Sequence, residues 1–195
     1  MPTPESYYKT KYGREFQPGQ GLPTVSTDLD SVRTYQFEVH FLGLPSTVSN
    51  ESDLTLAAKK VTGIGMSFEP IVVDRVNDKL YYPGKVSPEE VTITFDNLYL
   101  KETASDLWEY FKTIYDPITG EMTKNASPGG GSNSTFKANK VEIILLDNAL
   151  QPHSTIELYG VWPTKWSAAE FNYSVNDFHT IDVTFRYDFM NQSEL

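Results

Sequence analysis

The end of the chain alternates strictly between apolar and polar side chains. From residue 181 to residue 189 every second position is apolar and the positions between are polar: Ile181, Val183, Phe185, Tyr187 and Phe189 against Asp182, Thr184, Arg186 and Asp188. Successive side chains of a β-strand point to opposite faces, so this period predicts a strand with one buried face. Such a face must be covered by a second layer, which predicts a packed β-structure.

Several other segments have the same period. Alternation predicts strands at 35–41, 91–95, 141–145, 155–161 and 171–175. A further strand is predicted at 54–62, after a polar loop at 46–53. Two apolar runs, 68–74 and 79–82, flank Asn77-Asp78 and predict a hairpin with its tip at these two residues. The glycine pair Gly63 and Gly65 indicates a bulge or a close backbone approach before this hairpin.

One segment has the period of a helix. Its apolar residues between 103 and 116 follow the spacing of one helical stripe: Ala104, Leu107, Trp108, Phe111, Ile114 and Tyr115. Thr103 with Asp106 three residues later resembles a capping box, and Asp116-Pro117 predicts the helix end. The order of elements predicts an antiparallel, mainly β domain that carries a single helix.

Two segments have no sustained period. Residues 1–32 mix Pro, Gly, Ser, Thr and Tyr and predict an extended arm, and residues 117–135 predict a loop with a Gly-rich part at 127–134. We therefore expect one domain from residue 33 to residue 195. No apolar run is long enough to span a membrane, and the first residues do not resemble a signal peptide, so we expect a soluble chain with no membrane insertion of its own.

The residues with catalytic or metal-binding potential form no recognisable constellation. The chain has no Cys, and its three His residues lie far apart. No Gly-rich phosphate loop or nucleophile elbow is present. The carboxylate pairs Glu89-Glu90 and Asp74 with Asp78 adjoin turns, where solvated acids are the simpler interpretation. We expect no enzyme, no cofactor and no metal.

The charge of the chain is acidic and uneven. The formal net charge is −10, and residues 141–195 hold only Lys165 and Arg186 against eight acidic side chains. Duplex binding is driven by Lys and Arg that displace counterions, so this balance argues against tight binding to nucleic acid. A surface with this field would instead let nucleic acid pass without sticking.

Two blocks of the sequence resemble a known family. Leu158-Tyr-Gly-Val-Trp-Pro-Thr164, followed by the alternating run to Phe189, is similar to the end of tail tube proteins from contractile-tailed bacteriophages, where a Trp-Pro-Thr turn precedes a closing aromatic strand. The run Tyr35-Gln-Phe-Glu-Val-His-Phe-Leu-Gly43 resembles the first strand of that family. The likeness extends from about residue 33 to residue 189. The long arm at 1–32, an insertion at 47–53 and the Gly-rich loop depart from the pattern and leave the member of the tube group open.

The resemblance implies a structural subunit of a phage tail tube, in which two packed antiparallel sheets form a barrel or a sandwich with one helix at the flank. Hexameric rings of such subunits stack into a hollow tube inside a contractile sheath, and DNA passes through the lumen. The implied partners are further copies of the chain, the sheath, a tape measure protein, and baseplate and tail terminator proteins. The implied location is the tail of the virion, assembled in the cytoplasm of the host bacterium. A tube subunit of a phage-like contractile injection system and a tube initiator next to the baseplate are alternatives. Two further alternatives are a lectin-like β-sandwich and a small hydrolase with a carboxylate pair.

Two sets of residues are candidates for contacts within such a tube. The hairpin at about 68–85 is unusually apolar, and its side chains are either ordinary core or a contact with the next ring. The candidates for that contact are Val72, Val73, Val76, Leu80, Tyr81 and Tyr82. The polar faces of the strands supply candidates for the lumen: Glu38, Glu90, Asp96, Asp182, Arg186 and Asp188. The polar side of the helix is a candidate contact for the sheath: Glu102, Asp106, Glu109 and Lys112.

Overall fold

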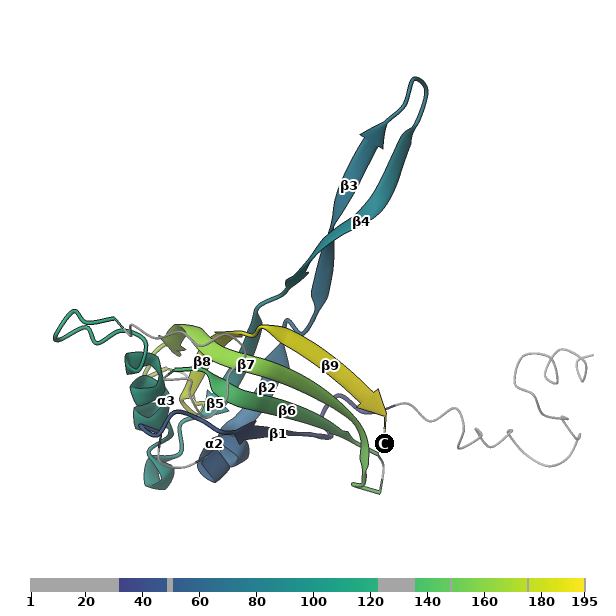
Figure 1. Ribbon diagram of the computed structural model, residues 1–195. Coiled ribbons are helices and arrows are strands. Elements are labelled where there is room, and N and C mark those ends of the chain that lie inside the picture. Colours follow the sequence, from purple (N-terminus) through teal and green to yellow (C-terminus); the bar gives the residue numbers. More distant parts are fainter. Residues whose placement is uncertain (1–31, 49–50, 123–135, 148, 175, 195) are drawn as a thin grey trace, which may run out of the picture. The chain divides into compact units, whose positions relative to one another are not determined.

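The computed structural model describes residues 32–48, 51–122, 136–147, 149–174 and 176–194 (Figure 1). The described residues from 33 onward belong to one compact unit. The predicted arm up to residue 31 and the Gly-rich part at 127–134 lie outside the described residues. No helix in the described ranges is both long and apolar enough to cross a membrane.

The body of this unit is built from two antiparallel sheets that share one long strand. Sheet A has the order β1 (Phe37–Leu42), β6 (Ala138–Leu146), β7 (Pro152–Ala168) and β9 (Phe189–Glu194). Sheet B has the order β7, β8 (Thr180–Arg186), β5 (Val91–Asp96) and β2 (Ala58–Thr62). The path of pairings ends at β1 and β2. The described strands therefore form an open, sandwich-like arrangement and not a closed barrel.

Strand β7 passes from one sheet to the other. Its first half pairs with β6 and β9, and its second half pairs with β8. Gly160 has a φ of 65° where the partner changes, and the register shifts between Pro163 and Lys165. A residue with positive φ and a bulge both bend a strand. The turn predicted at Trp-Pro-Thr is therefore wrong, because these residues lie within a continuous, bent strand.

The predicted terminal strand is two strands. Tyr187 and Asp188 separate β8, in sheet B, from β9, in sheet A. Ile181, Val183 and Phe185 are buried as predicted, whereas 51% of Phe189 is exposed. The prediction of a single strand is wrong because the alternation continues across the break and so carries no sign of the change of partner.

The core lies between the two sheets. The ring of Phe41, from sheet A, lies 6.0 Å from the ring of Phe95 and 6.1 Å from that of Phe185, both from sheet B. Most of the alternating apolar residues predicted in β1, β5 and β6 are buried, whereas Phe37 and Leu145 are half-buried. The buried residues are Val39, Phe41, Val91, Ile93, Phe95, Val141 and Ile143. Tyr35 is 69% exposed and precedes β1, so this strand begins two residues later than predicted.

Helix α3 (Thr103–Lys112) follows a short 3-10 helix, η2 (Tyr99–Lys101). The buried Tyr110 of α3 donates a hydrogen bond to the carbonyl of Val161 at 2.8 Å and accepts one from the N–H of Ala138 at 3.2 Å, which joins the helix to β7 and β6. Burial raises the pKa of this tyrosine. The capping box does not form: Glu102 is the N-cap, with a φ of 49° and no capping side-chain bond.

A second helix, α2 (Glu51–Ala57), is absent from the sequence prediction. It replaces the end of the loop predicted at 46–53 and the first part of the strand predicted at 54–62. Asp53, Leu54 and Ala57 are its buried residues, at helical spacing. Lys101 lies 2.9 Å from the carboxylate of Asp53, so an ion pair offsets the cost of the buried acid. The fold is mainly β as predicted, but it has two α-helices.

Candidate interaction surfaces

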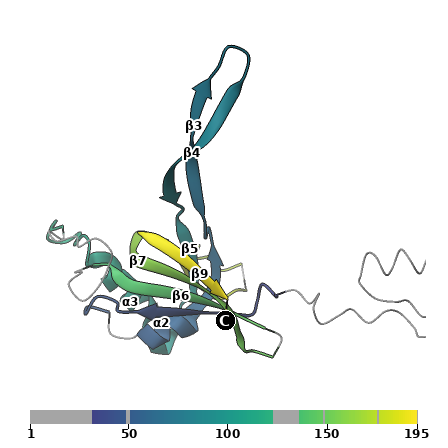
Figure 2. The same cartoon turned by 45° about the vertical axis from the view of Figure 1, so that its right-hand side comes forward.

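The most exposed element is a two-stranded hairpin, β3 (Met66–Asp74) and β4 (Lys79–Pro88). It extends away from the two sheets (Figures 1 and 2). The N–H of Arg75 donates to the carbonyl of Asp78 at 2.8 Å and closes the predicted tip. β4 continues past Pro83 and Gly84 to Pro88, beyond the run predicted at 79–82. The pairing register shifts between Phe68 and Pro70 of β3. This bulge lies next to the pair of Pro70 with Pro83 of β4 and lets the two strands stay paired on either side of it.

The hairpin is apolar on both faces. Paired residues of an antiparallel ladder share a face, so Val72 with Tyr81 lies on one face, and Val73 with Leu80 on the other. Five of the six predicted contact residues are exposed: Val72 (46%), Val73 (42%), Val76 (99%), Tyr81 (67%) and Tyr82 (51%). Leu80 is half-buried. These side chains are therefore not core of the described unit.

The sequence prediction missed further exposed apolar residues of the hairpin: Met66, Phe68, Ile71 and Val86. The signal was available for Phe68 and Ile71, which lie in the apolar run at 68–74, but the bulge breaks the alternation of that run. Met66 and Val86 lie outside the two runs. An isolated two-stranded hairpin is marginal in water, and one with two apolar faces needs a partner surface.

The base of the hairpin is fixed to sheet B. The hydroxyl of Tyr187 donates to the carbonyl of Gly65 at 2.5 Å, and the N–H of Glu89 donates to the same oxygen at 2.9 Å. A Cβ at Gly63 would lie 2.3 Å from the carbonyl oxygen of Glu90, so a side chain is excluded at this crossing. The predicted close approach at the glycine pair is thereby confirmed.

Four of the six candidate lumen residues lie together on the outer face of sheet B. Arg186 lies 2.8 Å from the carboxylate of Glu90, and Asp182 accepts a bond from the hydroxyl of Thr94 at 2.6 Å. Asp96 pairs with Lys59 at 3.1 Å. The sequence prediction missed Lys59 on this face, because alternation alone does not say which charged residues of other strands are neighbours.

Glu38 lies elsewhere, on the outer face of sheet A, where it contacts His40 at 3.1 Å. This face also holds Lys140, which pairs with Glu142 and with Glu157. Hydrogen bonds to both carboxylates raise the pKa of Lys140, and bonds chiefly from Lys140 lower the pKa of Glu157. The sequence prediction did not find this cluster, whose members come from different strands.

Asp188 lies at the corner between the sheets. Its carboxylate accepts bonds from Lys137 at 2.8 and 2.9 Å, and its N–H donates to the carbonyl of Tyr159 at 2.9 Å. The structure thus divides the candidate lumen residues between two sheets and the corner.

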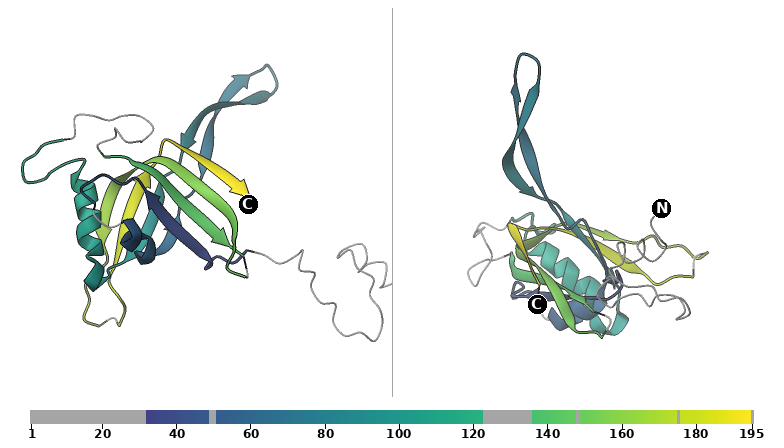
Figure 3. Two further views of the ribbon diagram at one scale, coloured as in Figure 1. Left: turned by 60° about the horizontal axis from the view of Figure 1, so that its bottom comes forward. Right: turned by 90° about the vertical axis from the view of Figure 1, so that its right-hand side faces the viewer.

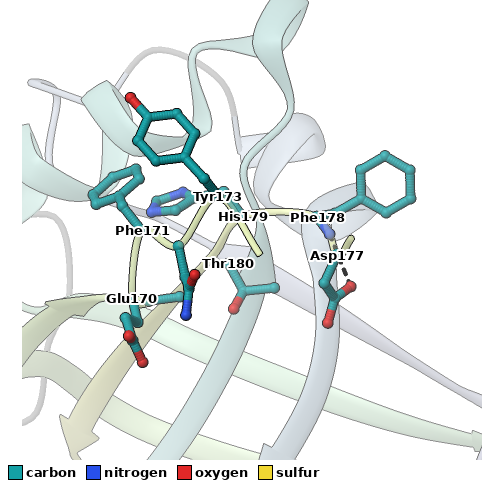
Figure 4. A pocket seen from close by; sticks show the side chains of 9 residues that line it. Glu170, Phe171, Tyr173, Asp177, Phe178, His179 and Thr180 are labelled. Atoms are coloured by element: carbon teal, nitrogen blue, oxygen red, sulfur yellow. Dashed lines mark hydrogen bonds between the residues drawn. The ribbon is translucent and has the colours of Figure 1, made fainter. Parts of the chain in front are cut away.

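The loop from β7 to β8 carries exposed aromatic rings around a pocket of about 540 Å³ (Figure 4). Phe171, Tyr173 and Phe178 are all more than 80% exposed. The ring of Phe171 stacks on His179 with 4.5 Å between centroids. The strand predicted at 171–175 is wrong for the described residues 171–174, which form a loop and a turn.

The chain matches one family model, described as T4-like virus tail tube protein gp19, over residues 33–191. The match covers the hairpin, both helices and every described strand except the end of β9. Among curated proteins there is no match.

Solved structures show the same fold at low sequence identity. A chain of the sheath–tube complex of an extracellular contractile injection system, in the extended state, has a TM-score of 0.63 and 17% identity, with 88% of this chain and 100% of that chain covered. A chain of the anti-feeding prophage baseplate has a TM-score of 0.63 and 18% identity over 85% of this chain and 97% of that one. A chain of the anti-feeding prophage cap has a TM-score of 0.62 and 16% identity over 88% and 100%.

Proposed function

The chain belongs to the T4-like virus tail tube protein family and is a tube subunit, and from this premise we propose that its copies close into hexameric rings that stack into a DNA-conducting tube. The match over residues 33–191 carries the proposal. The role is structural, and we propose no catalytic step.

Open sheet edges support ring closure. In the described part of the chain, β1, β2 and β9 each pair with a strand on one side only. Unpaired strand edges are sites for pairing with another chain, and closure into a cylinder removes them. We propose that neighbouring copies pair through such edges, so that the open arrangement of one chain becomes continuous around a ring.

The hairpin supports stacking. We propose that Val72, Val73, Val76, Leu80, Tyr81 and Tyr82 contact the next ring, because a two-faced apolar ribbon buries its surface only against another molecule. Head-to-tail contacts of this kind repeat without limit unless another protein caps them. We assign the setting of the tube length to a tape measure protein.

The polar face of sheet B is our candidate for the lumen. It groups Glu90, Asp96, Asp182 and Arg186, and two of its cations, Arg186 and Lys59, lie beside acids. Phosphates passing such a surface find cations that are already partly neutralised, which favours sliding over binding. Glu38 and Asp188 lie outside the polar face of sheet B. They stay candidates for the lumen, but at positions away from this face.

The tube requires partners at its wall and its ends. We propose that the polar side of α3 meets the sheath, and that baseplate and terminator proteins bind the two ends. The similar chains come from a sheath–tube complex, a baseplate and a cap. The particle we propose is a phage tail assembled in the bacterial cytoplasm and carried on the virion. A contractile injection system tube or a baseplate-proximal initiator is the second candidate, favoured by these same structures.

Electron microscopy of the purified chain at rising concentration tests the assembly. We expect sixfold rings that lengthen into hollow tubes. A chain that stays monomeric at every concentration, with and without a co-expressed sheath protein, would refute the conduit and favour the lectin-like or hydrolase alternatives. Recovery of DNA from intact particles, as opposed to a protein cargo, distinguishes the phage tail from the injection system.

A further inference from the structure

Strand β5 runs from the base of the hairpin to the opposite end of the sheets. It begins beside the base of the hairpin, where the N–H of Glu89 bonds to Gly65. It ends where Asp96 pairs with Thr180, the first residue of β8. Six residues separate these ends by about 20 Å. Figure 3 (left) shows the hairpin leaving the sheets at the top and the loop between β7 and β8, in yellow-green, at the bottom.

The end away from the hairpin carries a second group of exposed apolar side chains, which we name the aromatic end: Tyr99 (93%), Leu100 (88%), Phe171 (82%), Tyr173 (112%) and Phe178 (84%). They come from η2 and from the loop between β7 and β8. Large exposed apolar groups of this kind mark interaction surfaces.

Hydrogen bonds hold the two segments of the aromatic end together. The N–H of Asn97 donates to the carbonyl of His179 at 3.0 Å, and the side chains of these residues are hydrogen-bonded at 3.2 Å. The N–H of Ala169 donates to the carbonyl of Thr180 at 3.0 Å and closes the loop. These bonds fix the ends of the two segments, and the ring of Phe171 stacks on His179 at one of the fixed positions.

We propose that the aromatic end is the surface that receives the hairpin of a second copy of this chain in the neighbouring ring. The proposal rests on the stacking described under the proposed function. A head-to-tail stack needs two different surfaces at opposite ends of each subunit, and whatever the hairpin contacts must lie at the end facing it. Both surfaces are apolar and exposed, so a contact between them removes the apolar side chains of both from water.

Charge bears on the register of this pairing. The segment from 169 to 180 contains Glu170 and Asp177 and neither Lys nor Arg. The hairpin holds three acids, Glu69, Asp74 and Asp78, and three cations, Arg75, Lys79 and Lys85, of which Lys79 pairs with Asp74 at 3.3 Å. Where Arg75 or Lys85 lies at the rim of the contact, it would meet the loop acids, which favours one register of the two surfaces.

Disulfide cross-linking tests the contact, because the chain has no Cys to interfere. Val76→Cys with Tyr173→Cys in one chain places one thiol on each surface, and Val72→Cys with Tyr173→Cys samples the middle of the hairpin. Oxidised tubes of at least one double variant should give a ladder of covalent trimers and longer species. Each single variant should give dimers at most. The matched control is Val76→Cys with Leu150→Cys, since Leu150 is 63% exposed between β6 and β7, a segment that belongs to neither surface.

The outcomes separate this contact from the proposed function. Tubes by microscopy with a ladder support the aromatic end as the receiving surface. Tubes from both double variants with no ladder beyond the control overturn it and leave the tube intact. The unmodified chain serves as reference, because its failure to form rings or tubes would count against the proposed function. A Phe171→Ser, Tyr173→Ser variant should still form rings but not stack, and normal stacking by it would also overturn the contact.

Discussion

Gly160→Ala tests the bend that connects the two sheets. Gly160 has a φ of 65°, and a Cβ there would lie 2.3 Å from the Oδ2 of Asp188. An alanine in this conformation costs about 1–2 kcal/mol. The added methyl group must also displace a carboxylate whose Oδ1 and Oδ2 lie 2.8 and 2.9 Å from Lys137, and hydrogen bonds to charged groups contribute about 1.5–3 kcal/mol.

The expected loss in the free energy of unfolding is about 2–4 kcal/mol, because the exposed fraction of Asp188 reduces the second contribution. Urea unfolding of the monomer, followed by tryptophan fluorescence, measures it. With a slope of about 2 kcal/mol per M, the midpoint should fall by about 1–2 M.

A matched control separates the two contributions. Gly120 has a φ of 72°, and no atom lies within 4 Å of the position that a Cβ there would take, so Gly120→Ala should lose only the conformational part, about 1–2 kcal/mol. In a chain that already carries Asp188→Ala, the effect of Gly160→Ala should shrink to that of Gly120→Ala. Equal losses for the two glycines, or an unchanged loss without Asp188, would refute the argument from the close approach.

Four further predictions follow from single contacts. Val73→Asp, at an exposed hairpin position, should abolish stacking in sedimentation assays while changing the stability of the monomer by less than about 0.5 kcal/mol; normal tubes would contradict the proposed contact. Tyr110→Phe removes the buried hydroxyl that bridges α3, β6 and β7 and should lower the free energy of unfolding by about 1–3 kcal/mol, measured in urea. The folded structure lowers the pKa of Glu157, so the folded chain keeps this carboxylate charged at a pH where the unfolded chain takes up a proton. The charged carboxylate therefore stabilises the fold above about pH 4.5, and this stabilisation is lost as the pH falls. Glu157→Gln should reduce the acid sensitivity of the free energy of unfolding, measured by unfolding at a series of pH values. Asp182→Lys, on the outer face of sheet B, should slow DNA ejection from assembled particles and increase its salt dependence, and an unchanged rate would exclude this face from the lumen.

The periodicity of the sequence was sufficient to predict an element wherever that element buries one face along its whole length. The strands β1, β5, β6 and β8 and the helix α3 are predictable, because burial of one side leaves a period in the sequence. The hairpin is also predictable, since Asn77 and Asp78 mark its tip. Its exposure is not, because an apolar strand has the same pattern in a core and at an interface between chains.

The short and irregular elements depended on tertiary contacts. Helix α2 has only seven residues, too few for a clear period, and it forms where Leu54 and Ala57 are buried. The run at 171–175 alternates like a strand but forms a loop in its described part, because it lies beyond the end of the sheet, where it has no partner strand.

The sequence by itself determined the fold class, the family resemblance and the acidic charge. Only the tertiary structure decided how the candidate lumen residues divide between the sheets, and that the aromatic end lies opposite the hairpin. Alternation reports which residues of one strand share a face, but neighbours across a sheet are set by pairing between strands distant in sequence. Arg186 and Glu90 lie 2.8 Å apart for that reason, although nothing in their local sequences relates them.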